Sequence, residues 1–88
     1  MTERKVEVVN NLGIHARPSS MIVKAAQRFT SNITIVKGGA VADAKSIMSV
    51  MMLAATCGST VAIRASGSDE NDAVEAIAAL FARKFDEE

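Results

Sequence analysis

The sequence predicts an α+β fold: a two-layer open-faced sandwich in which a four-stranded antiparallel sheet carries three helices on one face. Apolar residues alternate with a period of two in four short segments and recur with helical spacing in three others, in the order βαββαβα. Only the two middle strands follow one another directly, through a Gly-Gly turn. The other strands are joined through helices, which favours helices covering one side of an antiparallel sheet.

The first strand is expected at residues 5–9, with Val6 and Val8 on one of its faces. After a polar break the period changes, and a helix is expected to begin at Ala16. Its apolar stripe follows the spacing i, i+3, i+4, i+7 and consists of Ile22, Ala25, Ala26 and Phe29. Pro18 is compatible with this helix because it falls in the first turn, where its missing N–H has no partner to lose.

A tight hairpin is expected next. Ile33 and Ile35 alternate with Thr34 and Val36, which indicates a strand. Gly38 and Gly39 supply the two positive-φ positions that a two-residue turn favours, and a further strand is expected at residues 40–44.

A short helix is expected after Ser46, whose hydroxyl can cap it. This helix is apolar on more than one side and carries Ile47, Val50, Met51 and Ala54. Val50 and Leu53 are expected in the core. Gly58 is expected to be the left-handed residue that ends the helix.

The last strand is expected at residues 60–65, with Val61 and Ile63 buried. A Ser-Gly-Ser turn follows, and Asp69 is expected to cap the last helix. One apolar stripe of this helix is formed by Val74, Ile77, Ala78, Phe81 and Phe85. The acidic end at residues 86–88 is expected to fray.

Length and composition limit the class of protein. The 88 residues are expected to form one domain, 1–88. Ten Lys and Arg balance ten Asp and Glu, so the excess positive charge of nucleic-acid-binding proteins is absent. One cysteine and one histidine cannot build a four-ligand zinc site, and we expect no metal and no other cofactor. The longest apolar stretch, 47–55, is far too short to insert into a membrane, and no secretory pattern opens the chain, so a cytoplasmic location is expected.

The only histidine of the chain, His15, lies at a strand-to-helix junction. Gly13 permits a tight turn before it, and the helix that follows directs free N–H groups toward it, which is a ready site for an anion. A neutral imidazole nitrogen can attack phosphorus, and Arg17 can reach phosphate oxygens with its planar fork. These residues indicate a phosphoryl acceptor, although a single histidine beside a helix start is also compatible with an ordinary cap or surface residue.

Three separated motifs resemble HPr, the histidine phosphocarrier of the bacterial phosphoenolpyruvate-dependent sugar phosphotransferase system; they lie at residues 13–18, 45–51 and 67–73. The resemblance covers essentially the whole chain. It implies that enzyme I phosphorylates His15 at Nδ1, and that His15 then donates to an enzyme IIA domain. Such a protein is a carrier and not an enzyme. Arg17 and Pro18 match the active-site positions of the family, and Lys24 falls near the surface that meets enzyme I.

The second motif carries a serine, Ser46, that matches a regulatory position of the family. The resemblance implies phosphorylation of Ser46 by an HPr kinase/phosphorylase, which exists in many lineages but not all. Ile47, Met48 and Met51 are expected to form an exposed apolar patch for partners, because flexible methionines adapt to several surfaces. Two alternatives are also compatible with the sequence: Ser46 as a helix cap alone, and the apolar residues as part of the core.

Two other functions are compatible with the sequence. One is a nitrogen-type phosphotransferase carrier that acts on regulators. The other is an unrelated small ligand-binding α+β domain in which His15 only caps a helix. We expect a monomer with transient interfaces, because a carrier must leave each partner quickly.

Overall fold

The computed structural model describes residues 1–86. Four strands and three α-helices follow the predicted order βαββαβα, and a 3-10 turn ends the described chain. The elements are β1 (Thr2–Glu7), α1 (Ala16–Ala26), β2 (Asn32–Lys37), β3 (Ala40–Asp43), α2 (Ile47–Met52), β4 (Thr60–Ser66), α3 (Glu70–Ala82) and η1 (Lys84–Asp86). The predicted fold class is confirmed.

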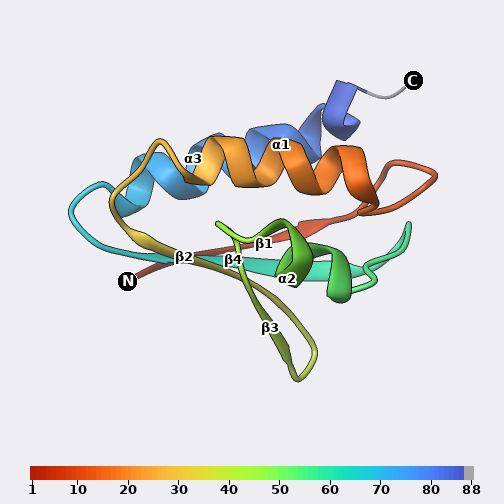
Figure 1. Cartoon of the computed structure of the whole chain (residues 1–88), viewed down its shortest axis with the longest axis horizontal. Helices are drawn as coiled ribbons and strands as arrows, with labels where there is room; N and C mark the ends of the chain where they lie inside the picture. Colours follow the sequence, from red (N-terminus) through yellow and green to blue (C-terminus); the bar gives the residue numbers. More distant parts are fainter. Residues whose placement is uncertain (87–88) are drawn as a thin grey trace.

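The four strands form one antiparallel sheet in the order β1-β4-β2-β3 (Figure 1). In the central pair Ile63 of β4 lies opposite Ile35 of β2, and Ile35 in turn lies opposite Ala42 of β3. Opposite residues of neighbouring strands point to the same face, so these side chains form one apolar row. This row lies beneath the helices.

The core lies between the sheet and the two long helices, α1 and α3, which run side by side above it (Figure 1). Ile22 of α1, Ile63 of β4 and Ile77 of α3 are completely buried there. Both stripes predicted from helical spacing face this layer, except that Phe29 lies beyond the end of α1 at Ala26 and is half-buried at the edge of the core. No helix within residues 1–86 combines the length and the apolarity needed to cross a bilayer.

Two predicted elements have clearly different boundaries, and two strands differ by one residue, since β3 ends at Asp43 instead of 44 and β4 at Ser66 instead of 65. β1 spans Thr2–Glu7 instead of 5–9, because its ladder with β4 begins at Thr2, opposite Ala65. α2 ends at Met52 and not at Gly58; Ala54 takes the left-handed conformation after the helix, with a φ of 51°. Gly58 lies in the next turn instead, where its N–H donates to the carbonyl of Val8.

Two turn details also differ from the prediction. The hairpin has the expected two-residue loop, since Lys37 pairs with Ala40, but only Gly38 of the two glycines has a positive φ. Asp69 does occupy the N-cap position of α3, yet its side chain makes no capping hydrogen bond. Its carboxylate instead accepts the backbone N–H groups of Thr30 and Ser31 at 2.9 and 3.0 Å, and so joins α3 to the segment after α1.

The end of the described chain is more ordered than expected. Phe85 belongs not to α3 but to η1, where Lys84, Phe85 and Asp86 all have positive φ. Phe85 is buried and packs edge-to-face on Phe81, with ring centroids 4.9 Å apart. The N–H of Asp86 donates to Arg83, so Asp86 is not frayed. Residues 87–88, to which the same prediction applied, lie outside the described residues.

Candidate functional site

His15 is the N-cap residue of α1, with extended backbone angles of −103° and −160°. Its own N–H donates to the carbonyl of Gly13 at 3.2 Å, and its carbonyl accepts the N–H of Ser19 at 2.9 Å. The imidazole is half-buried and makes no capping hydrogen bond to the helix. The backbone of His15 therefore starts the helix, while the ring is not used to close it.

The first turn of α1 favours negative charge beside His15. The N–H groups of Ala16 and Arg17 have no partner within the helix, as at any helix start. Pro18 is buried and its ring fixes the backbone of the first turn. Because it has no N–H, it adds no third free donor to this turn. Two amides and the positive end of the helix dipole thus lie at the residue that carries the ring, and a helix start of this kind stabilises an anion.

The loop before His15 is held from two sides. Gly13 is in the left-handed conformation, with a φ of 71°, and its carbonyl accepts the side-chain Nδ2 of Asn10 at 2.7 Å. On the other side, the N–H of Ile14 donates at 2.9 Å to the carbonyl of Ala55, which follows α2. The end of α2 and the loop after β1 therefore position the residue that precedes His15.

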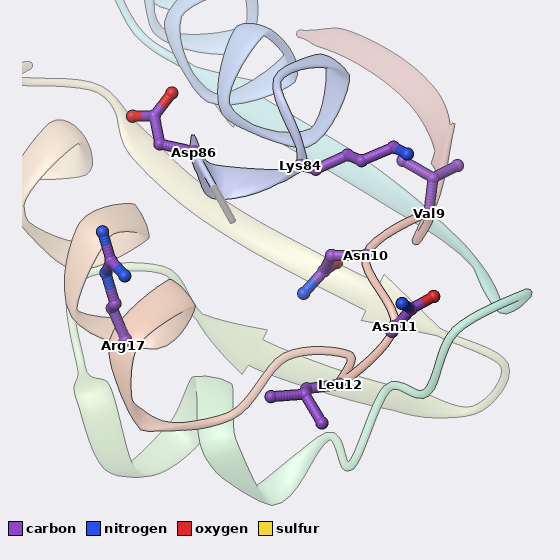
Figure 2. Close-up of a pocket in the computed structure, with 7 residues that line it drawn as sticks. All are labelled: Val9, Asn10, Asn11, Leu12, Arg17, Lys84 and Asp86. Atoms are coloured by element: carbon purple, nitrogen blue, oxygen red, sulfur yellow. The ribbon is translucent and has the colours of Figure 1, made fainter. Parts of the chain in front are cut away.

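Arg17 is exposed and faces an open pocket of about 430 Å³ (Figure 2). In Figure 2 its side chain rises from α1 on one side of the pocket, and Asn10 lies on the other. The lining residues are Val9, Asn10, Asn11, Leu12, Arg17, Lys84 and Asp86. The pocket thus unites the first turn of α1, the loop after β1 and the 3-10 turn η1, and His15 is not among its lining residues.

The remaining predicted residues lie on the outer surface of α1 and on α2. Lys24 is exposed near the end of α1, nine residues or about 13 Å along the helix from His15, and borders a separate shallow pocket with Arg28. Ser46 is half-buried at the N-cap of α2, and its Oγ accepts the N–H of Ser49 at 3.3 Å. The predicted cap is confirmed.

The exposed side of α2 is apolar. Ile47, Met48 and Met51 are all exposed, as predicted, whereas Val50 and Leu53 are buried in the core. Met52 is exposed as well and was not singled out from the sequence. Its spacing does not distinguish it from core positions, so only the packing of α2 against α1 and β3 decides which side of the helix is free.

Asn10 and Ser19 are buried polar residues beside His15 that were not singled out from the sequence. For Asn10 in particular, the local sequence gives little indication. The signal in the sequence is weak, because an asparagine before a Gly turn is common in exposed loops. Only 2% of Asn10 is exposed in the folded chain, which a local sequence pattern does not reveal.

A single histidine at the start of the first helix of this fold is typical of a known class of bacterial proteins. Residues 2–83 match the family model PTS-HPr, described as the PTS HPr component phosphorylation site. The chain belongs to the HPr family of phosphocarrier proteins of the phosphotransferase system.

Individual relatives agree with this assignment over the full length. The phosphocarrier protein HPr of Treponema pallidum (strain Nichols) is 48% identical over 88 residues, which cover 100% of both chains. Among solved structures, HPr-C-His from Thermoanaerobacter tengcongensis matches with a TM-score of 0.95 and 40% identity, covering 100% of this chain and 99% of that one. A structure described as an HPr dimer from the same organism matches with a TM-score of 0.79 and 39% identity, covering 99% of this chain and 100% of that one.

Proposed function

We propose that this chain accepts a phosphoryl group from enzyme I on Nδ1 of His15 and donates it to an enzyme IIA domain of the sugar phosphotransferase system. The observation that carries the proposal is the position of His15 at the N-cap of an 11-residue helix. Two helix amides and the guanidinium-bearing Arg17 belong to the same turn. This turn can stabilise a dianion without enclosing it.

The transfer is a displacement at phosphorus. The lone pair of Nδ1 attacks, an N–P bond forms, and the bond from phosphorus to the donor group of enzyme I breaks, with the electron pair leaving on the donor. Amides and Arg17 oppose the charge on the phosphoryl oxygens, which is the main contribution that a protein makes to phosphoryl transfer. In the second transfer an acceptor group of enzyme IIA attacks the phosphorus. The N–P bond breaks, and its electron pair returns to Nδ1 of His15. His15 is modified in each cycle, so the chain acts as a carrier and not as an enzyme.

The surface around the site suits acidic partners with an apolar centre. Residues 8–42 contain no Asp or Glu but four basic residues, which are Arg17, Lys24, Arg28 and Lys37. The exposed Ile47, Met48 and Met51 provide the apolar part. Basic residues at the rim accelerate association with an acidic surface, and the apolar part contributes contact area. We therefore propose that the partners contact Lys24 and the α2 patch, which is formed by Ile47, Met48 and Met51. These four residues are the proposed docking surface.

Ser46 is proposed as a regulatory phosphorylation site. It lies directly before Ile47 and Met48 in the proposed docking surface. A phosphate there adds ~1.5–2 negative charges, which would oppose the docking of an acidic partner without refolding the domain. Its capping bond to Ser49 is compatible with this role.

Phosphorylation by enzyme I tests the central proposal. Incubation with phosphoenolpyruvate and enzyme I is expected to add one acid-labile, base-stable phosphate per chain, and none to the His15→Ala variant. An unmodified wild-type chain would overturn the proposal and favour the small ligand-binding domain instead. Transfer from the charged chain to a sugar-type or a nitrogen-type enzyme IIA domain then identifies the pathway served.

Two further measurements address regulation and assembly. With ATP and an HPr kinase, we expect an acid-stable phosphate that the Ser46→Ala variant lacks; its absence from the wild type would limit Ser46 to capping. We also propose that the chain acts as a monomer in the cytoplasm. Sedimentation at rising concentration tests the oligomeric state, and a stable dimer would contradict it.

A further inference from the structure

Asn10 is a buried amide whose hydrogen bonds converge on the loop that carries His15. Only 2% of Asn10 is exposed. Its Nδ2 donates to the carbonyl oxygen of Gly13 at 2.7 Å, and its backbone carbonyl accepts the N–H of Gly13 at 3.1 Å. Burying an amide is costly unless its hydrogen bonds are strong, so this residue contributes a specific orientation as well as volume.

The carbonyl oxygen of Gly13 joins Asn10 to His15. It accepts Nδ2 of Asn10 and also the backbone N–H of His15, at 2.7 and 3.2 Å respectively. The next N–H, that of Ile14, is held by the carbonyl of Ala55. Because the peptide between Gly13 and Ile14 is held at both of its polar atoms, its plane cannot rotate. The point from which the imidazole extends is thereby fixed.

We propose that Asn10 is a positioning residue for phosphoryl transfer: through the carbonyl of Gly13 it holds the backbone of His15 in the orientation that in-line attack requires. The inference rests on the proposed role of His15. An acceptor nitrogen must approach phosphorus on the side opposite the leaving group, and small displacements lower the fraction of productive encounters. Asn10 acts through the backbone and not by touching the phosphoryl group.

If Asn10 is a positioning residue, its replacement lowers the rate of phosphoryl transfer and does not weaken docking to enzyme I. Asn10 lies in the loop after β1, whereas the proposed docking residues lie on the outer side of α1 and on α2. Replacing Asn10 with Ala removes the donor to Gly13 and leaves those exposed side chains unchanged. We expect the KM for enzyme I to stay within about twofold of the wild-type value and kcat to fall roughly tenfold.

Ser31 offers a matched control. It is equally buried, with 1% exposed, and its hydroxyl donates to the carboxylate of Asp69. It lies beyond the C-terminal end of α1, whereas His15 precedes the N-terminal end. Ser31→Ala therefore removes the side-chain hydrogen bond of an equally buried residue far from the site, and we expect it to lower stability without changing kcat or KM.

The experiment compares wild type, Asn10→Ala and Ser31→Ala as acceptors from phosphoenolpyruvate-charged enzyme I. Amide chemical shifts report the hydrogen bonds: those of Gly13, Ile14 and His15 should move in Asn10→Ala and stay in Ser31→Ala. If Asn10→Ala does not fold, Asn10→Asp keeps the size of the side chain and also lacks the donor. A rate loss caused only by its added charge would shrink at high salt, whereas a positioning loss would persist.

The outcomes separate the two proposals. A wild-type chain that takes no phosphate refutes the role of His15 and with it this inference. A phosphorylated wild type with an unchanged kcat in the folded Asn10 variant refutes the inference alone. An equal loss of kcat in Ser31→Ala, or a loss confined to KM, also refutes it, because general destabilisation or docking would then explain the effect.

Discussion

The carbonyl oxygen of Ala55 occupies the space that a side chain on Gly13 would need: a Cβ there would lie 2.5 Å from that oxygen and 3.0 Å from the Cα of Thr56. Both neighbours are backbone atoms of the segment that follows α2. Gly13 also has a φ of 71°, which L residues rarely adopt. Two independent constraints, backbone angle and close approach, therefore require glycine directly before the Ile14-His15 pair.

We expect Gly13→Ala to be strongly destabilising. The left-handed backbone costs about 1–2 kcal/mol and the clash with backbone atoms about 1–3 kcal/mol more, so the free energy of unfolding should fall by roughly 2–5 kcal/mol. Urea denaturation followed by circular dichroism measures it. Gly38→Ala is the control, because Gly38 shares the positive φ but has open space around it, and its loss should be about 1 kcal/mol. Equal losses in the two variants would refute the role of Ala55.

Ala54→Gly is expected to stabilise the protein. Ala54 is exposed and has a φ of 51°, so glycine relieves a strained backbone without removing buried contacts. The gain should be about 0.5–1 kcal/mol after the greater flexibility of glycine in the unfolded chain is subtracted. Ala79, which is exposed within α3, provides the control: Ala79→Gly should cost about 1 kcal/mol. A destabilised Ala54→Gly variant would contradict the strain at this residue.

The fold could be predicted because its elements bury one face each. Ile33, Ile35, Val61 and Ile63 show the period of two that a sheet with one covered face imposes, and the stripes of α1 and α3 show the helical period. The ends of helices were harder to predict from the sequence. By its conformational preference Gly58 could have ended α2, but its N–H donates to the carbonyl of Val8, which lies 50 residues away in the chain. Tertiary contacts, which no local pattern contains, selected Ala54 instead.

The candidate site was predictable in part for the same reason. His15, Arg17 and Pro18 lie within four consecutive residues, so their common helix turn could be inferred from the sequence alone. Ala55 acts through a contact between separate segments, since its carbonyl accepts the N–H of Ile14, and Asn10 acts within the loop after β1 through Gly13; its burial is visible only once the chain is folded. Asp69 shows a third case: its position at the N-cap was correct, but its carboxylate binds Thr30 and Ser31 and does not cap the helix.

The carboxylates at the start of α3 predict a loss of stability in acid. The hydroxyl of Ser31 and the N–H of Thr30 lower the pKa of Asp69 from 3.8 to about 2. The hydroxyl of Thr2 and the N–H of Gly67 lower the pKa of Glu70 from 4.5 to about 2. Each folded-state pKa lies below its ordinary value. The stabilisation is therefore complete above about pH 5 and is lost as the pH falls through 4 toward 2.

Asp69→Asn tests this pH dependence. The variant should be less stable than the wild type at neutral pH, and the difference should shrink as the pH approaches 2, where Asp69 itself becomes protonated. Urea midpoints measured between about pH 6 and pH 2 give both curves. Ser68→Ala, an exposed neutral change in the adjoining turn, should run parallel to the wild type. A difference between Asp69→Asn and wild type that stays constant with pH would show that the charge of Asp69 is not the source of the stabilisation.

Met48→Ala should weaken binding to enzyme I without affecting the fold. Met48 is 69% exposed on α2, so its truncation removes little buried area within the chain, but removes contact area from the proposed docking surface. We expect the Kd to rise about tenfold, which corresponds to a loss of about 1.4 kcal/mol of binding free energy, with an unchanged thermal midpoint. Calorimetric titration measures the Kd. Val41 on β3 is 66% exposed and lies outside the proposed docking surface, so Val41→Ala should leave the Kd unchanged. Should the two variants bind enzyme I equally well, the α2 patch does not carry the interaction, and the docking surface must be sought around Lys24 and Arg28 instead.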